Sequence, residues 1–188
     1  MTVSHVSSDI TVPQPSQSVQ LTGVCDIPSQ SSGFRFNHTM LRIKDPKRSL
    51  EFYTGVLGMT LLCVKRFEQM SFDLYFLAKL SEAERQNLPE GDDLAIYTFR
   101  QRGILELTHN YGTEDDEGFS YHSGNSEPKG FGHICFCVPD LSAAVAWFDA
   151  KGVAFQKRPE EGKMNNIAFI KDPDGYWIEI VQADLMAD

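Results

Sequence analysis

The stretches FNHTMLRIKDP at residues 36–46 and FGHICFCVPD at residues 131–140 share one pattern. Each opens with Phe-x-His, continues as a strand-like run, and reaches an Asp seven residues after the His. Asp45 and Asp140 are each expected to cap a helix, because an Asp side chain accepts hydrogen bonds from the free N–H groups of the first turn. The shared spacing predicts that the chain contains an internal duplication.

A short amphipathic helix is predicted after each Asp. Pro46 suits the first position of the first helix, where its missing N–H costs nothing. Gly58 and Gly152 suit the C-terminal caps of the first and the second helix. The apolar positions recur at helical spacing: Leu50, Tyr53 and Leu57 in the first helix, and Leu141, Ala144, Val145 and Phe148 in the second.

Strands are predicted after each helix, at 60–66, 71–77, 94–100 and 103–109, and again at 153–157, 166–171 and 176–182. Each half is therefore interpreted as a βαβββ module. The predicted fold class is α+β, with two tandem modules whose curved sheets enclose a cleft. The predicted domains are a flexible N-terminal tail or arm at 1–33, modules at 34–112 and 131–188, and a connecting loop at 113–130.

The composition excludes several classes of protein. The 188 residues include 17 Lys and Arg against 26 Asp and Glu, a formal charge of −9, which disfavours binding to nucleic acid through its phosphates. The sequence has no apolar run long enough to span a membrane. We expect neither nucleic acid nor a membrane as a partner.

The cysteines indicate a reducing environment. Cys25, Cys63, Cys135 and Cys137 form no C-x-x-C motif, and residues 1–33 lack the basic and apolar regions of a secretory signal. We therefore expect free thiols in a cytoplasmic protein. Cys135 and Cys137 are expected to be small apolar residues in the core.

One His on the first strand and one Glu on the last strand recur in each half. The pairs are His38 with Glu106, and His133 with Glu179. A carboxylate within an apolar strand is costly if it is buried without a partner. Two His and two Glu suit a divalent transition metal, with room left for water or substrate. The alternatives are a structural ion pair and an edge-strand Glu that faces water.

Four stretches together resemble the glyoxalase I family of lactoylglutathione lyases, in the vicinal-oxygen-chelate superfamily. They are HTMLRIKDP at 38–46, LELTHN at 105–110, GFGHI at 130–134 and DPDGYWIE at 172–179. The resemblance runs from about residue 34 to the C-terminus and includes GTEDDE at 112–117, typical of the long eukaryotic type. It implies the paired βαβββ fold and methylglyoxal detoxification.

The resemblance implies metal ligation by His38, Glu106, His133 and Glu179. Long-type members usually carry Gln at the position of His38, whereas short bacterial members carry His and commonly use nickel or cobalt. Zinc is therefore expected first, with nickel or cobalt as the alternative. The implied reaction converts the hemithioacetal of methylglyoxal and glutathione into S-lactoylglutathione through an enediolate. Glu179 is the expected principal base, and Glu106 would serve the opposite face of the substrate.

The resemblance also implies contacts to the substrate. The expected glutathione anchors are Arg42, Asn110, Lys129, Lys157 and Met164. The residues expected around the aldehyde side chain are Phe67, Phe72, Leu74 and Phe76. Arg42 lies about 13 Å from His38 along one strand face, a distance that suits a tripeptide. Lys129 replaces the usual Arg and loses bidentate geometry. Solvated surface lysines and core aromatic residues are the alternative interpretations.

Family members of this length are homodimers whose active sites lie at the subunit interface, so the resemblance implies the same assembly here. Each metal site would take His38 and Glu106 from one subunit, and His133 and Glu179 from the other. Two other functions remain open on this scaffold. An Fe(II) dioxygenase would leave one Glu unexplained, and a metal-free ligand-binding module would need neither Glu.

Overall fold

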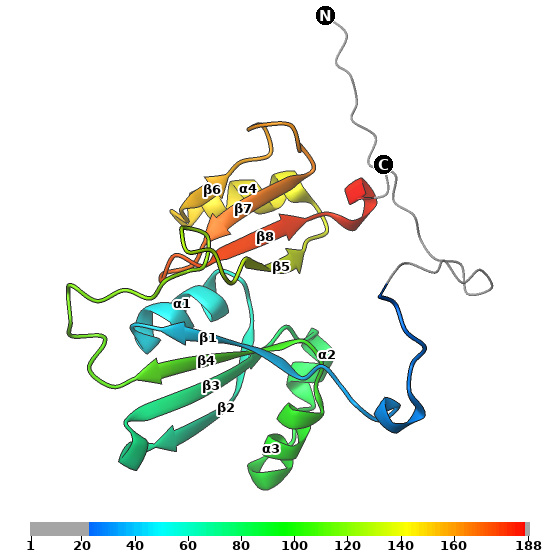
Figure 1. The fold of residues 1–188 in the computed structure, drawn as a ribbon, viewed down its shortest axis with the longest axis vertical. Helices are drawn as coiled ribbons and strands as arrows, with labels where there is room; N and C mark the ends of the chain where they lie inside the picture. The colour runs from blue at the N-terminus through cyan, green and yellow to red at the C-terminus, as the bar shows by residue number, and fades with distance from the viewer. Residues whose placement is uncertain (1–22, 187–188) are drawn as a thin grey trace, which may run out of the picture.

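The structure is a computed structural model that describes residues 23–186, and the predicted tail falls mostly outside this range. Two four-stranded mixed sheets have the strand orders β1-β4-β3-β2 and β5-β8-β7-β6 (Figure 1). The longer elements are β1 (His38–Ile43), α1 (Pro46–Gly55), β2 (Thr60–Phe67), β3 (Phe72–Ala78), α2 (Glu82–Gln86), α3 (Gly91–Arg100), β4 (Ile104–Asn110), β5 (His133–Cys137), α4 (Leu141–Ala150), β6 (Phe155–Lys157), β7 (Ile167–Lys171) and β8 (Trp177–Val181). Three short 3₁₀ turns occupy Ser29–Ser31, Glu68–Met70 and Ala183–Met186. The α+β class and the paired βαβββ architecture are confirmed.

Both predicted Asp caps are present. The Asp45 carboxylate accepts hydrogen bonds from the backbone N–H groups of Lys47 and Arg48 at the start of α1, and Asp140 accepts one from Ala143 at the start of α4. These bonds satisfy N–H groups that have no partner within the helix. None of the helices in the described range is long and apolar enough to cross a membrane.

The two sheets repeat the same strand register. β1 runs parallel to β4 with Met40 opposite Glu106, and β5 runs parallel to β8 with Cys135 opposite Glu179. In both sheets the two parallel strands are the last two strands at one edge of the sheet. The internal duplication therefore places the two glutamates at equivalent positions.

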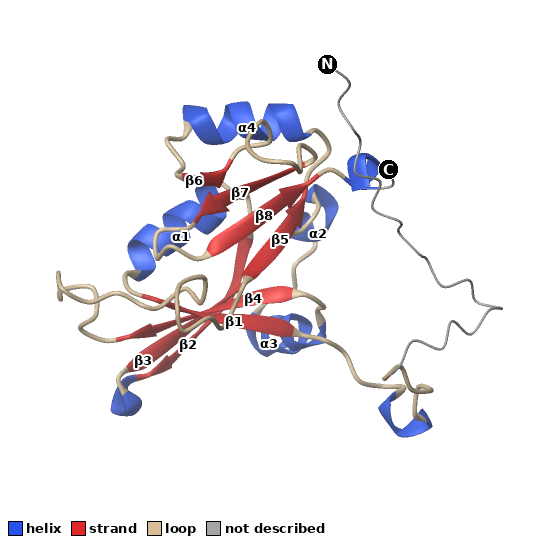
Figure 2. Ribbon diagram, turned by 45° about the horizontal axis from the view of Figure 1, so that its top comes forward, coloured by secondary structure: helices blue, strands red, loops and turns tan. Residues whose placement is uncertain are grey.

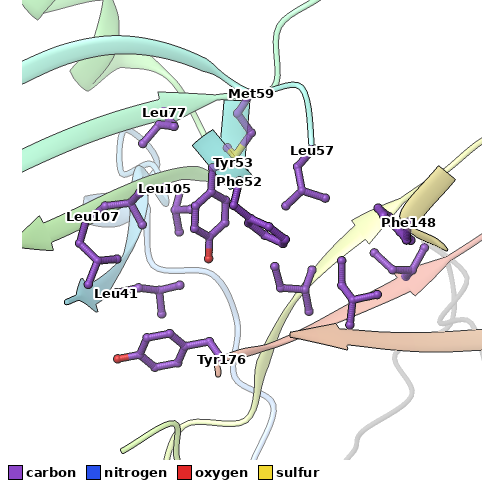
Figure 3. Close-up of a cluster of buried hydrophobic side chains, with 14 of the residues drawn as sticks. Leu41, Phe52, Tyr53, Leu57, Met59, Leu77, Leu105, Leu107, Phe148 and Tyr176 are labelled. Atoms are coloured by element: carbon purple, nitrogen blue, oxygen red, sulfur yellow. The ribbon is translucent and has the colours of Figure 1, made fainter. Parts of the chain in front are cut away.

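The main core joins the two modules. Helix α1 lies between the two sheets and α4 covers the second sheet (Figures 1 and 2). Phe52, Tyr53 and Leu57 of the first module belong to one buried cluster with Phe148 and other residues of the second (Figure 3). Because this cluster takes one face of each sheet, the opposite face, which carries the His and Glu residues, points away from it.

Polar contacts also connect the modules, through the turn between β7 and β8. Tyr53 on α1 donates a 2.8 Å hydrogen bond to the Asp172 carboxylate. The Asp174 carboxylate accepts hydrogen bonds from the Lys44 backbone N–H, at 2.9 Å, and from the Ser49 hydroxyl, at 3.3 Å. The turn that precedes the strand of Glu179 is thus fixed to the first module.

The strand predicted at 94–100 is wrong, because this segment is the helix α3. The sequence LAIYTFR contains β-branched and aromatic residues at four consecutive positions, from Ile96 to Phe99, which suggested a strand. Its more buried positions, Leu94, Ala95, Tyr97 and Thr98, follow the helical period instead. Tyr97 packs on a second buried cluster formed by Leu62, Phe76, Ala78, Leu80 and Ile104. The α2–α3 insertion therefore covers part of the Glu106 face of the first sheet.

Candidate metal and active site

The first His–Glu pair lies on neighbouring parallel strands of the first sheet. His38 begins β1 and Glu106 lies in the middle of β4, and their Nε2 and Oε2 atoms are 3.1 Å apart. The side chains are 33% and 12% exposed. The other carboxylate oxygen, Oε1, accepts a 3.0 Å hydrogen bond from the Thr108 hydroxyl. One oxygen of Glu106 therefore faces the His38 imidazole, and the other accepts from the Thr108 hydroxyl.

The second pair repeats this geometry in the second sheet. His133 begins β5 and Glu179 lies in the middle of β8, with Nε2 and Oε2 3.3 Å apart and side-chain exposures of 41% and 21%. Where Glu106 accepts from a hydroxyl, Glu179 has the thiol of Cys135 as its neighbouring donor. The two carboxylates are equivalent in position but not in their hydrogen bonding.

A phenylalanine lies edge-on to each imidazole. His38 and Phe76 have ring centroids 5.7 Å apart at 78°, and His133 and Phe169 have centroids 5.2 Å apart at 76°. Phe76 was predicted as a site residue, but Phe169 was not. Register was the available signal, because Phe76 pairs with Glu106 and Phe169 with Glu179. Each half-site thus contains a His, a Glu and a Phe.

Within one chain the two half-sites do not meet. Across the described range, no three His, Cys, Asp or Glu side chains come close enough to hold one metal ion. The reason is the central core, which occupies the opposite face of both sheets. A single chain therefore supplies two separate ligand pairs and no complete four-ligand shell.

Two of the expected glutathione anchors lie on the same face as the first pair. Arg42 is exposed and lies opposite Thr108, two residues further along β4 than Glu106. Asn110 ends β4, and its amide nitrogen donates a 2.9 Å hydrogen bond to the Tyr121 hydroxyl. The predicted connecting loop therefore contributes a contact that holds Asn110, and Tyr121 was not among the predicted residues.

The expected anchors of the second half lie differently. The Lys157 ammonium donates to three backbone carbonyls, those of Arg158, Met164 and Ile167, at 3.1, 2.6 and 3.1 Å. It closes the loop of residues 158–166. Met164 on this loop is 56% exposed. Lys129 is 74% exposed and lies 3.8 Å from the Glu127 carboxylate.

The residues expected around the aldehyde side chain share the face of the first pair but differ in burial. Phe76 is only 1% exposed and belongs to the cluster beneath α2–α3, with Leu74 packed against it. Phe67 and Phe72 stack at a centroid distance of 4.8 Å, and Phe67 is 36% exposed. The set therefore divides into a packed half and an accessible half.

The predicted burial of Cys135 and Cys137 in the core is wrong. Both are free and exposed, on the same face of β5 as His133. Partial burial, followed by the Glu179 carboxylate across the strands, raises the pKa of the Cys135 thiol to about 11. A thiol with that pKa stays protonated near neutral pH, which makes it a poor nucleophile.

Comparison with known proteins identifies the family. The model of the Glyoxalase/Bleomycin resistance protein/Dioxygenase superfamily matches residues 35–180. A lactoylglutathione lyase of Pseudomonas aeruginosa is 54% identical over 165 residues, which cover 87% of this chain and 91% of that protein. A lactoylglutathione lyase of Pseudomonas putida is 53% identical over 150 residues, covering 79% and 85%.

A solved structure shares the fold. The glyoxalase I of Leishmania major, described as trypanothione-dependent, superposes with a TM-score of 0.60 at 30% identity, covering 82% of this chain and 90% of that one. The matching register of the two sheets agrees with this likeness. The chain therefore belongs to the glyoxalase I family within the Glyoxalase/Bleomycin resistance protein/Dioxygenase superfamily.

Proposed function

We propose that this protein is a metal-dependent lactoylglutathione lyase. It would convert the hemithioacetal of methylglyoxal and glutathione into S-lactoylglutathione and so detoxify methylglyoxal. Two lactoylglutathione lyases that are 54% and 53% identical in sequence to this chain support the proposed reaction. The observation that carries metal dependence is the repeated pair of an imidazole nitrogen facing a carboxylate oxygen, at 3.1 and 3.3 Å.

The side chains fit a divalent transition metal. Imidazole nitrogen and carboxylate oxygen are ligands that zinc, nickel and cobalt accept. His38, Glu106, His133 and Glu179 would hold the ion, with Zn²⁺ the first choice and Ni²⁺ or Co²⁺ the alternative. The ion would supply Lewis-acid stabilisation of the negative charge that develops on the vicinal substrate oxygens.

The two glutamates suit different parts of the proton transfer. The reaction removes a proton from C1 of the hemithioacetal and returns one to C2. Glu179 is the proposed principal base, since its side chain is more exposed than that of Glu106 and its neighbouring donor is the Cys135 thiol, a weaker donor than a hydroxyl. The Thr108 hydroxyl already occupies one oxygen of Glu106. Glu106 would act on the opposite face of the substrate.

Glutathione carries carboxylates that require fixed cations in an acidic protein. Arg42 and Asn110 share the face of the first pair and are the proposed anchors there. The guanidinium of Arg42 has no ion-pair partner among the described residues, so it is available to a carboxylate. Lys129, Lys157 and Met164 are the proposed contacts from the second module.

A homodimer would complete each site. The two ligand pairs of one chain lie on faces directed away from the shared core, so neither pair can complete the other within the chain. Two-fold association would bring the first pair of one subunit to the second pair of its partner, and a two-fold interface forms both sites together. Cys135 and Cys137 would then lie within the interface instead of facing water.

The activity is tested by mixing protein, glutathione and methylglyoxal and following the absorbance of the thioester product. We expect thioester formation that stops after chelation and returns with Zn²⁺ or Ni²⁺. Glu51→Gln, on the exposed side of α1, is the matched control and should keep full activity. A protein that binds metal but forms no thioester would favour a dioxygenase, and one that binds no metal would favour a ligand-binding module.

Shared sites are tested by subunit exchange. Homodimers of His38→Ala and of Glu179→Ala should both be inactive. A heterodimer of the two would carry one doubly damaged site and one intact site, so activity should recover to about half of wild type per dimer. No recovery after demonstrated exchange would place each site within one chain.

A further inference from the structure

The side chain of Asn37 connects His38 to the end of helix α3. Its amide nitrogen lies 3.0 Å from the Gln101 carbonyl oxygen and 3.3 Å from the Thr98 carbonyl oxygen. Its amide oxygen lies 2.8 Å from Nδ1 of the His38 imidazole. One side chain therefore contacts both the α2–α3 insertion and the first histidine of the proposed metal shell.

The hydrogen-bonding capacities of these groups fix the orientation of the Asn37 amide and place a hydrogen on Nδ1 of His38. A backbone carbonyl only accepts hydrogen bonds, so the NH₂ group of Asn37 must face Thr98 and Gln101. Its oxygen then faces the imidazole, and an amide oxygen also only accepts. A hydrogen on Nδ1 of the His38 ring therefore faces the Asn37 oxygen, and Nε2, the atom that faces Glu106, is left as the ligating nitrogen.

In the neutral ring, the lone pair of Nε2 faces an acceptor. Nε2 of His38 and Oε2 of Glu106 are 3.1 Å apart, and neither atom carries a hydrogen when the ring is neutral with its proton on Nδ1. The repulsion between two such acceptors is removed by a cation, which is either a second ring proton on Nε2 or the metal ion that replaces it. The contact to Asn37 thus prepares the ring to ligate a cation through Nε2.

We infer that Asn37 is a positioning residue, which holds the His38 ring with its proton on Nδ1 and its Nε2 available to the metal ion. The inference rests on the proposed function and extends it to a residue outside the ligand set. Without the Asn37 oxygen, the ring proton can move to Nε2 and donate to Glu106, which occupies the ligating atom. A hydrogen bond to the far nitrogen of a ligating imidazole is a general means of fixing its orientation.

The second half-site provides an internal comparison. His133 follows Gly132, which has no side chain to take the place of Asn37. Among the described residues, the Glu179 carboxylate is the only polar partner of the His133 imidazole, and Phe169 is its aromatic neighbour. The two repeat-equivalent histidines therefore have similar orientations, but only the His38 ring is held by a neighbouring amide.

Two substitutions separate the acceptor role of Asn37 from its donor role. Asn37→Asp keeps an oxygen for the His38 ring but cannot donate to the α3 carbonyls. Asn37→Leu has a similar size and removes both functions. Asn87→Leu is the matched control. Asn87 follows the last residue of α2, its side chain donates to the Ala83 carbonyl, and it lies outside the proposed metal shell.

The readout is the affinity for Zn²⁺ alone, measured by competition with a chromophoric chelator on the full-length protein. We expect Asn37→Leu to weaken binding by about 10–100-fold, while Asn37→Asp and Asn87→Leu retain it. In the Zn²⁺-loaded wild type, proton NMR should show a slowly exchanging imidazole N–H from His38. That signal should disappear in Asn37→Leu, while the signals of His133 stay unchanged.

Three results would overturn the inference. Unchanged Zn²⁺ affinity in Asn37→Leu would show that the ring needs no positioning. Equal losses in Asn37→Asp and Asn37→Leu would assign Asn37 to the support of α3 instead. A wild-type protein that binds none of Zn²⁺, Ni²⁺ and Co²⁺ would overturn both the inference and metal dependence. Thioester formation by the wild-type protein, with Zn²⁺ affinity unchanged in Asn37→Leu, would overturn the inference alone and leave the proposed function intact.

Discussion

Replacing Asp172 with an asparagine should change how the stability of this protein depends on pH. Asp172 is 5% exposed, and its carboxylate accepts hydrogen bonds from the Tyr53 hydroxyl and from the backbone N–H groups of Asp174 and Tyr176, at 2.8, 2.9 and 2.8 Å. Burial raises its pKa from 3.8 to about 6, and the hydrogen bonds from Tyr53 and Tyr176 offset part of that rise. Desolvation is therefore the larger effect.

The direction of the pH dependence follows from this raised pKa. The folded state binds the proton of Asp172 more tightly than the unfolded state does, so Asp172 favours folding most below its unfolded pKa. This contribution is lost as the pH rises from about 4 to about 6. At about 1.4 kcal/mol per pH unit, the loss is about 3 kcal/mol in the free energy of unfolding.

An asparagine side chain at this position would be neutral at every pH in this window, and it fits the same contacts. Its amide oxygen can accept from the two backbone N–H groups, and its amide nitrogen can donate to the Tyr53 oxygen. The Asp172→Asn variant should therefore be more stable than wild type at neutral pH, and the two should converge towards pH 4. Asp92→Asn, on an exposed position of α3, is the control and should follow wild type.

The assay is urea unfolding at one fixed protein concentration, followed by tryptophan fluorescence at a series of pH values. The quantity compared is the difference in free energy of unfolding between Asp172→Asn and wild type, since other titrating groups cancel in it. A difference that stays constant from about pH 4 to pH 7 would refute the assigned pKa and its cause.

Three further outcomes are expected. Glu179→Gln should lower kcat for the hemithioacetal by about 10²–10⁴-fold, because an amide cannot accept the proton; kcat close to wild type would exclude Glu179 as the base. Arg42→Ala should raise KM at unchanged metal content, by the equivalent of about 1.5–3 kcal/mol, and an unaltered KM would exclude a carboxylate contact. Asp140→Ala should lower the free energy of unfolding by about 0.5–2 kcal/mol through loss of the α4 cap, whereas replacing the exposed Asp184 should not; equal losses would contradict the cap.

The repeated half-site was accessible to sequence reasoning because it depends on local periodicity. Strand alternation placed His38 and Glu106 on one face, and the duplication placed His133 and Glu179 on the other sheet in the same register. The same reasoning failed for Cys135, since alternation says which residues share a face but not whether another element covers it. Covering depends on packing between segments distant in sequence.

Two other features depend on such distant contacts. The segment of α3 has the composition of a strand, and its helical form is stabilised by packing on the cluster around Phe76. Asn37 contacts carbonyls 61 and 64 residues further along the chain, so no local pattern identifies its role. The separation of the two ligand pairs within one chain likewise follows from where α1 packs between the sheets.

At the proposed glutathione contact, the ammonium group of Lys157 would link substrate recognition to the order of its own loop. A lysine has three N–H donors, and here three carbonyls around the loop of residues 158–166 engage them. A ligand carboxylate can recruit this ammonium only by displacing at least one carbonyl. The closed loop would therefore weaken the binding of the carboxylate. Because coupling is reciprocal, the bound carboxylate would destabilise the closed loop by the same free energy. The flexibility of this loop would therefore help to set the affinity of the protein for a ligand carboxylate at Lys157.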